Sequence, residues 1–379
     1  MRIPFNKPYF TGNETKYIEE AVKSGHISGN GSFTKKCQSF FEKKFSIKKV
    51  LLTKSCTSAL EMCALLINIK PGDEVIMPSY TFVSTANAFT LRGANIILCD
   101  SRKDHPGIDE TAIEELITDK TVAIVPVHYA GVACDMEKIM SLAAKYNLFV
   151  VEDAAQAIGS YFTFSDGTKK ALGSIGHLAA FSFHETKNII SGEGGLLAIN
   201  EEKFIERAKI IWEKGTNRSA YYRGEVDKYE WVDLGSSFLP SEITAAFLWA
   251  QFENFNKIQN QRKEIWNRYY DLLKSYKLKL PIIPIYAFNN AHMFYIICTS
   301  LNQRTAIIYA LEKEKIQAVF HYFPLHKSSF YLKSHIENKL IQSDFFNDHL
   351  LRLPFFYELN ITKQKKVCSV IAKELLQDN

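Results

Sequence analysis

The chain is predicted to fold as an α/β protein with a large, mostly parallel sheet domain and a smaller α/β domain after it. Short apolar runs alternate with amphipathic stretches of about ten residues through the first 151 positions, a pattern typical of parallel strands joined by helices. Helical periodicity then covers 241–275, and the composition changes beyond it. At 379 residues the chain also exceeds the usual size of a single core.

The elements follow from these patterns in order. In the first domain, 1–240, the apolar runs predict strands, and the amphipathic stretches between and around them predict helices. The expected strands are 50–53, 74–77, 95–99, 122–127, 148–151 and 177–181. The expected helices are 13–24, 32–45, 57–66, 81–91, 109–117, 135–146 and 204–214. A connecting helix over 241–275 leads to the domain 276–379, with strands 293–299 and 318–321, a helix 305–313 and a terminal helix from 362.

Composition narrows the class of protein. The hydrophobic fraction of 46% and charged fraction of 23% are ordinary for a globular enzyme. A net charge of +5 without a basic block favours anionic small ligands over nucleic acid. Seven cysteines at irregular spacing indicate reduced thiols, and neither a secretory signal nor a membrane-spanning run is present in the sequence. We therefore expect a cytoplasmic protein that binds neither nucleic acid nor a membrane.

The sequence FSFHETKN at 181–188, followed by GEGG at 192–195, is the stretch around which we interpret the chain. Lys187 stands just past a buried strand, where partial burial and neighbouring positive charge favour the neutral amine. A neutral lysine can form a Schiff base with an aldehyde cofactor. The alternative interpretation is that Lys187 is one of the many solvated lysines of a lysine-rich chain.

Two other strand ends carry polar groups. The turn at 53–60, TKSCTSAL, contains small hydroxyl residues and starts a helix. The free backbone N–H groups of this helix start can bind a phosphate. The alternative is that the hydroxyl residues only cap the helix. Cys56 in this turn is interpreted as a packing residue. After strand 148–151, only one of Glu152 and Asp153 should face the sheet edge, where an acid can hold a pyridinium nitrogen protonated; turn capping is the alternative.

Other candidate residues are less specific. Phe82 suits either the core or a stack against a flat ring. Arg218 and Arg223 suit phosphate recognition or a solvated loop. His321 and His326 lack a carboxylate or cysteine at matching spacing, so no metal site is expected. The segment 162–169 is longer than a usual turn, and we assign it no function.

Taken together, SCTSAL at 55–60, VEDAAQ at 151–156 and FSFHETKN at 181–188 resemble the DegT/DnrJ/EryC1/StrS sugar aminotransferases, in the same order and at similar intervals. The resemblance implies a fold-type-I transferase like aspartate aminotransferase, dependent on pyridoxal 5'-phosphate. The resemblance covers nearly the whole chain. It is stronger to the branch of the family that makes dTDP-4-amino-4,6-dideoxygalactose for enterobacterial common antigen. The segments that carry it are VPVHYAGVACD at 125–135, EKGTNRS at 213–219 and AVFHYFPLH at 318–326.

Carried over by position, the resemblance implies roles for individual residues. Lys187 would form the Schiff base, and Asp153 would bind the pyridine nitrogen. Cofactor contacts would also come from Gln156 at the ring or its phenolic oxygen, Phe82 on the ring face, and Cys56, Thr57 and Ser182 at the phosphate. Asn217 would come from the second subunit of a homodimer with shared sites. The candidates for the sugar nucleotide are Arg218, Arg223 and His326. Cys56 and Glu185 stand where many relatives have glycine and proline.

The expected reaction moves an amino group from L-glutamate to a dTDP-4-keto-6-deoxyhexose, for O-antigen or lipopolysaccharide synthesis. Amination at C3 of a 3-keto sugar is the nearest alternative, because relatives use one core for either carbon. Non-catalytic sugar-nucleotide sensing on the same fold is another, but no DNA-binding segment accompanies the chain. Lys187 disfavours a dehydratase, which would carry a histidine there, and no glycine fingerprint supports an NAD-dependent reductase.

Overall fold

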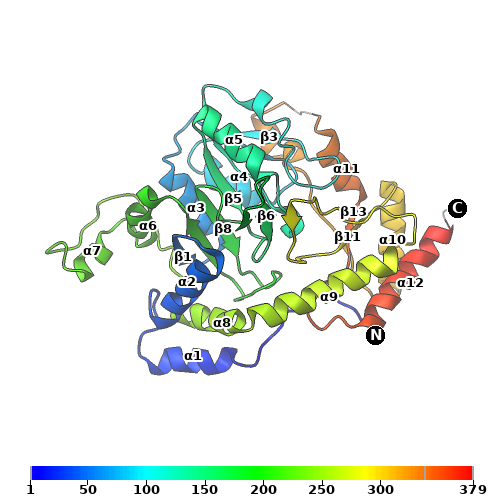
Figure 1. Ribbon diagram of the computed structural model, residues 1–379, viewed down its shortest axis with the longest axis horizontal. Coiled ribbons are helices and arrows are strands. Elements are labelled where there is room, and N and C mark those ends of the chain that lie inside the picture. Colours follow the sequence, from blue (N-terminus) through cyan, green and yellow to red (C-terminus); the bar gives the residue numbers. More distant parts are fainter. Residues whose placement is uncertain (1, 337–338, 378–379) are drawn as a thin grey trace.

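A seven-stranded sheet forms the centre of the computed structural model, which describes residues 2–336 and 339–377 (Figure 1). The strand order is β1-β9-β8-β5-β4-β2-β3. β9 runs antiparallel to both of its neighbours, and the other neighbouring pairs are parallel, which confirms the predicted, largely parallel sheet. Its strands are β1 Lys49–Thr53, β2 Glu74–Pro78, β3 Asn95–Cys99, β4 Thr121–Ile124, β5 Phe149–Asp153, β8 Leu178–Ser182 and β9 Gly195–Ile199.

Helices cover both faces of this sheet, because its strands are apolar on both sides. Val50 and Leu52 of β1 pack into one buried cluster with α2, α5 and α8, whereas Leu51 between them packs into another with α3, α4 and α6. This alternation is the two-residue period of a strand. The helices of this domain are α1 Glu14–Lys23, α2 Ser32–Phe45, α3 Cys56–Leu66, α4 Val83–Thr90, α5 Met136–Tyr146, α6 Ile205–Trp212 and α7 Arg218–Tyr222.

A second, smaller sheet has the order β11-β13-β12 and its own buried cluster. Two consecutive helices, not one, connect the two sheets, with a break at Asn254. α9 begins in the cluster of the large sheet and ends in that of the small one. Ile3 also packs into the small cluster and pairs with Ile316. The elements are α8 Glu242–Glu253, α9 Phe255–Leu273, β11 Tyr295–Ile297, α10 Leu301–Lys313, β12 Val319–Phe320, α11 Ile341–His349, β13 Leu350–Arg352 and α12 Ile361–Gln377.

One predicted helix is not formed, and strands form at 195–199 (β9) and around 162–169, where none was predicted. The helix expected at 109–117 is replaced by turns and the short 3₁₀ helix Glu114–Leu116, because the Asp109 carboxylate accepts hydrogen bonds from the Thr111 N–H and hydroxyl. Such a local bond favours a turn over a helix. The unassigned segment 162–169 belongs to a hairpin of β6 Tyr161–Thr163 and β7 Lys169–Ala171, which β10 Ala287–Phe288 extends.

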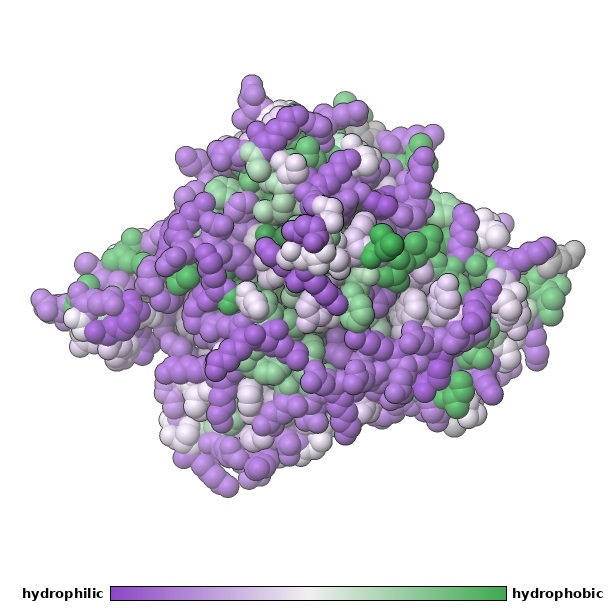
Figure 2. Space-filling view, viewed as in Figure 1, coloured by the Kyte–Doolittle hydropathy of each residue, from purple (hydrophilic) through white to green (hydrophobic). Residues whose placement is uncertain are grey.

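The surface and the helix lengths can be compared with those of membrane-spanning proteins. The face in Figure 2 is mostly hydrophilic, with its hydrophobic atoms in small groups. Within residues 2–336 and 339–377, no helix has the length and apolar composition required to cross a bilayer.

The entry to α2 depends on a carboxylate from far along the chain. Gly31 stands at the N-cap and offers no side-chain acceptor. Glu242 at the start of α8 accepts instead from the N–H groups of Gly31 at 3.0 Å, Phe33 at 2.7 Å and Thr34 at 3.1 Å, and from the Thr34 hydroxyl. A buried carboxylate in this position satisfies donors that a helix start leaves open and complements the helix dipole.

Glu242→Ala should therefore lower the free energy of unfolding by about 2–4 kcal/mol, because four donors lose their acceptor together. Urea denaturation followed by circular dichroism measures this. Glu264→Ala, at an exposed position of α9, serves as the control and should stay within about 0.5 kcal/mol of the unmodified protein. Equal unfolding midpoints for the two variants would contradict the role of Glu242.

Candidate active site

A cavity of about 630 Å³ opens at the carboxyl ends of the parallel strands. This is the edge where sheets of this type bind ligands. It brings together seven of the residues singled out from the sequence, contributed by the ends of β1, β5 and β8 and by the segments that follow them and β2. These are Cys56, Thr57, Phe82, Asp153, Gln156, Ser182 and Lys187.

Asp153 ends β5 and lines this cavity with a fixed carboxylate. Oδ2 accepts a hydrogen bond from the Thr85 hydroxyl at 2.8 Å, and Oδ1 accepts from the Ala155 N–H at 3.1 Å. Because Thr85 donates to Asp153, the hydroxyl of Thr81, 2.9 Å away, donates to Thr85. A carboxylate held in one orientation can bind a cationic ring nitrogen without the entropic cost of ordering it first.

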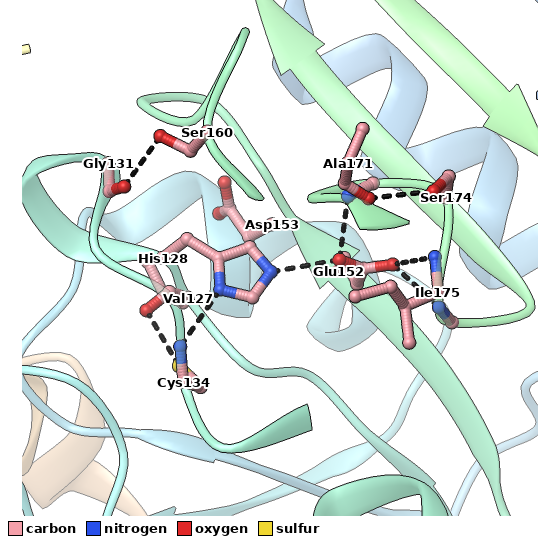
Figure 3. A network of polar contacts seen from close by, with 12 residues as sticks. Val127, His128, Gly131, Cys134, Glu152, Asp153, Ser160, Ala171, Ser174 and Ile175 are labelled. Carbon is pink, nitrogen blue, oxygen red and sulfur yellow. Dashed lines mark hydrogen bonds and ion pairs between the residues drawn. The ribbon is translucent and has the colours of Figure 1, made fainter. Parts of the chain in front are cut away.

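Glu152, one residue earlier, points away from the cavity into the protein (Figure 3). Its carboxylate accepts from four donors, His128 Nε2 at 2.9 Å and the N–H groups of Gly173, Ile175 and Gly176 at 2.6–2.8 Å. The Cys134 N–H donates to Nδ1 of His128, so the proton shared with Glu152 sits on Nε2. The prediction that only one of the two acids faces the sheet edge is confirmed.

Lys187 reaches the cavity from the turn after β8. Burial lowers the pKa of its ammonium group and neighbouring Arg352 lowers it further, whereas Cys56 and Asp153 oppose the shift. A lowered pKa increases the fraction of neutral amine, the form that attacks an aldehyde. The Lys187 side chain is partly buried and lines the cavity, so it is not one of the fully exposed lysines of the surface.

A hydrogen-bond network fixes the backbone beside Lys187. Asn188 donates both amide protons, to Gln259 Oε1 at 2.9 Å and to the Asn290 carbonyl at 3.0 Å. Its amide oxygen therefore accepts from Nδ1 of His292, 2.8 Å away. Burial, with the charges of Lys187 and Arg262, lowers the pKa of His292, so a neutral imidazole lines the cavity beside the lysine.

The start of α3 offers free backbone N–H groups of the kind that bind a phosphate. The Ser55 side chain accepts from the Ser58 N–H, and the N–H groups of Cys56 and Thr57 occupy the first turn, where a helix provides no acceptor. Gly195 of β9 faces this turn. A Cβ at that position would lie 2.2 Å from the Ser55 carbonyl carbon and 2.4 Å from the Cys56 nitrogen. The turn therefore has the close backbone packing that a phosphate cradle requires.

These groups fit pyridoxal 5'-phosphate. Asp153 would hold the ring nitrogen, Lys187 the aldehyde carbon, and the start of α3 with Ser182 the phosphate. Phe82 is 56% exposed and lines the cavity, so its core interpretation is wrong and its aromatic face is available to a flat ring. Gln156 accepts from the Ala130 N–H at 2.6 Å and donates to the Tyr322 hydroxyl at 3.2 Å, which fixes its amide at the cavity wall.

The structure does not bring the remaining predicted residues into the cavity of one chain. Asn217 and Arg218 begin the arm around α7, where Arg218 contacts Tyr222. Arg223 pairs with Glu206 and Glu225 at the surface. His326 is buried with Nδ1 2.7 Å from the Ser79 hydroxyl. Their roles toward a partner chain or a sugar nucleotide stay predictions.

Sequence reasoning missed several residues that line the cavity. Thr85 stands one helical turn after Thr81, and this spacing of two hydroxyls was a detectable signal. The others come from the N-terminal segment and from the region of the small sheet, and the sequence analysis assigned none of them to the cofactor site, having considered His321 only as a metal ligand. They are Phe5, His292, His321, Tyr322 and Arg352. Among residues 2–336 and 339–377, no three His, Cys, Asp or Glu side chains gather closely enough to hold a metal ion.

Comparison with known proteins places this geometry in context. A model of the DegT/DnrJ/EryC1/StrS aminotransferase family matches residues 8–372. Protein MJ1066 of Methanocaldococcus jannaschii is 32% identical over 340 residues, 88% of this chain and 86% of that protein. The spore coat polysaccharide biosynthesis protein SpsC of Bacillus subtilis is 30% identical over 347 residues, 87% and 86% of the two chains. The aminotransferase TlmJ from Streptoalloteichus hindustanus, 25% identical, superposes with a TM-score of 0.91 over 100% of both chains.

Gly195→Ala should weaken binding of pyridoxal phosphate about 10- to 100-fold, because the added methyl group displaces the backbone of the Ser55–Cys56 turn. Titration of the cofactor-free protein, followed by absorbance, measures the dissociation constant. Asn95→Ala, at an exposed position of β3 that does not line the cavity, is the control and should change the affinity less than about threefold. Unchanged affinity in Gly195→Ala would exclude the start of α3 as the phosphate seat.

Proposed function

The chain belongs to the DegT/DnrJ/EryC1/StrS aminotransferase family, and from this premise we propose that it transfers the amino group of L-glutamate to C4 of a dTDP-4-keto-6-deoxyhexose. The protein is a pyridoxal-phosphate-dependent sugar aminotransferase. The nucleotide, the carbon that is aminated and the amino donor are the parts that we propose. The observation that carries the proposal is the presence of Lys187, Asp153 and the phosphate seat around one cavity.

Each polar residue has a distinct task in this reaction. When bound, pyridoxal phosphate supplies an aldehyde for the amine and a ring that takes up electron density. Asp153, fixed by Thr85 and Ala155, holds a proton on the ring nitrogen. Lys187 removes a proton from the α-carbon of the donor and later returns one to C4 of the sugar. A lowered lysine pKa suits both directions of this transfer near neutral pH.

A sugar nucleotide is supported by the kind of relative and by the openness of the site. SpsC takes part in spore coat polysaccharide biosynthesis, and a surface polysaccharide such as O-antigen or lipopolysaccharide is the destination that we propose for the amino sugar. The cavity of about 630 Å³ is within the size range of sites that bind small organic ligands. A cytoplasmic location stays a prediction from the cysteine pattern.

We further propose a homodimer in which Asn217 completes the site of the neighbouring chain. The arm around α7 projects from the body of the molecule at the left of Figure 1. It exposes large aromatic side chains, with Tyr222 70% and Trp231 77% accessible. The Glu230 N–H fixes the Asn217 amide oxygen at 2.8 Å. Exposed aromatic groups on a projecting arm suit a protein partner, and the second copy of this chain is the partner that we propose.

The reaction predicts two colour changes. L-Glutamate should bleach the yellow, cofactor-loaded protein, and dTDP-4-keto-6-deoxyglucose should restore the colour. Nuclear magnetic resonance of the product should place the nitrogen on C4. Lys187→Ala should show neither change, because the amine that moves the proton is missing. A product aminated at C3, or restoration of colour only by a 3-keto sugar, would contradict the proposed regiochemistry.

A shared site predicts complementation between two inactive variants. Mixed dimers of Lys187→Ala and Asn217→Ala would contain one site with both native residues. Random exchange should therefore restore about a quarter of the normal activity. Each variant alone, treated identically, is the control. If mixing restores nothing while native gel electrophoresis shows that chains exchange, Asn217 does not serve a neighbouring site.

A further inference from the structure

A second cavity, of about 800 Å³, opens outside the catalytic site. Four parts of the chain form its walls: the loop after β3, the helix α9, the segment 278–283 and the helix α11. The segment 278–283 runs antiparallel to β11, where the Ile297 N–H donates to the Lys279 carbonyl at 2.9 Å. Among the described residues, none lines both this cavity and the catalytic one. A cavity of this size accommodates a small organic ligand.

Aromatic rings form two of these walls. On α9, the ring of Tyr270 stacks on that of Trp266, with centroids 5.5 Å apart and 13° between the planes. Tyr270 is 39% exposed, so part of its ring surface stays open to the cavity. On α11, the partly buried Phe345 lines the same cavity. Open aromatic surface of this kind binds flat rings by stacking, which contributes about 1–3 kcal/mol for a nucleobase.

The charged side chains of the cavity leave it with an excess of positive charge. Asp104 is already compensated, because its two oxygens accept hydrogen bonds from Nε and Nη2 of Arg102 at 2.8 and 2.9 Å. Lys274 pairs with a carboxylate of its own helix at 2.6 Å. Lys103 and Lys279, in contrast, form no ion pair with any carboxylate of residues 2–336 and 339–377. Two ammonium groups are therefore available to an anionic ligand.

Positive charge and aromatic surface lie next to each other in this cavity. Nζ of Lys279 is 5.7 Å from the centroid of the Phe345 ring. A nucleoside diphosphate matches both features, because its base is flat and its phosphates accept hydrogen bonds from ammonium groups. An uncharged aromatic compound would leave both lysines without a partner. An inorganic anion would leave the aromatic surface in water.

We propose that this second cavity binds a nucleoside diphosphate, with the base on the aromatic surface of α9 and the phosphates on Lys103 and Lys279. The site is independent of the proposed amino transfer, because its lining residues differ from those around Lys187. Stacking does not distinguish one base from another, so the site should accept nucleotides with different bases.

The test follows Trp266 by fluorine nuclear magnetic resonance in the cofactor-loaded protein labelled with 5-fluorotryptophan. The chain has four tryptophans, and the Trp266→Phe variant identifies the resonance of the one that lines the cavity. Trp249 on α8 lines neither cavity and reports on the rest of the molecule. ADP is the ligand used, because the catalytic cavity is proposed to bind a thymidine nucleotide. Adenosine and inorganic pyrophosphate each retain one part of ADP.

ADP should shift the Trp266 resonance saturably and leave the Trp249 resonance unchanged. Adenosine and pyrophosphate should each bind at least about 10-fold more weakly than ADP, because each lacks one of the two kinds of contact.

The variants separate the two kinds of contact. Lys103→Ala and Lys279→Ala should each weaken both ADP and pyrophosphate about 5- to 10-fold. Tyr270→Ala should weaken ADP about 10-fold and change pyrophosphate less than about twofold, because pyrophosphate has no base to stack. Lys277→Ala and Tyr309→Ala, at exposed positions outside the cavity, are the matched controls and should keep the affinity for ADP within about twofold.

A Trp266 resonance that stays unmoved at about 5 mM ADP, a concentration that fills most of a site with millimolar affinity, would overturn the proposal. Equal affinities for pyrophosphate and ADP would overturn it as well, because the base would then make no contact. So would equal losses of affinity in Lys277→Ala and Lys279→Ala. A retained near-ultraviolet circular dichroism spectrum establishes that each variant is folded.

Discussion

The alternation of side chains at the end of β5 is the constraint on which the site depends. Glu152 turns into the protein, where His128 and three backbone N–H groups satisfy its carboxylate. Asp153, next in the strand, must then face the cavity, where Thr85 and Ala155 orient it. A carboxylate with four donors is costly to move, because each donor would lose its partner. The buried Glu152 therefore fixes the end of β5, and the end of β5 fixes the direction of Asp153 toward the cavity.

The small sheet contributes the opposite wall of the cavity. Asn188, next to Lys187, is bonded to Gln259 on α9, to the Asn290 carbonyl and to His292. These contacts couple the turn that carries the lysine to elements more than seventy residues away. Rigid coupling of this kind suits the proposed reaction, because both of its proton transfers would require the same placement of Lys187.

The electrostatic character of the cavity follows from the burial of its titratable side chains and from the difference in their hydrogen-bond partners. Burial lowers the pKa of both Lys187 and His292, and the imidazole remains neutral. Arg352 keeps its charge, and its hydrogen bond goes to a neutral histidine. The cavity therefore combines an oriented carboxylate at Asp153, an amine whose pKa is lowered and a buried guanidinium that has no carboxylate partner among residues 2–336 and 339–377. This arrangement favours ligands that bring their own negative charges, as a cofactor phosphate and an amino acid do.

Sequence alone determined six of the seven strands of the large sheet and the helices α1 to α6, because the two-residue and 3.6-residue periods are local properties of the chain, but it missed β9. It also located Lys187, Asp153 and the start of α3, since each follows a strand whose end is readable. It failed at 109–117, where a local Asp109 hydrogen bond overrode the apolar pattern. Tertiary structure alone decided which of the predicted residues share a cavity, and it added Phe5, His292 and Arg352 to them. No periodicity marks these residues, because they share a cavity with Lys187 only after segments one hundred residues or more apart in the sequence have come together.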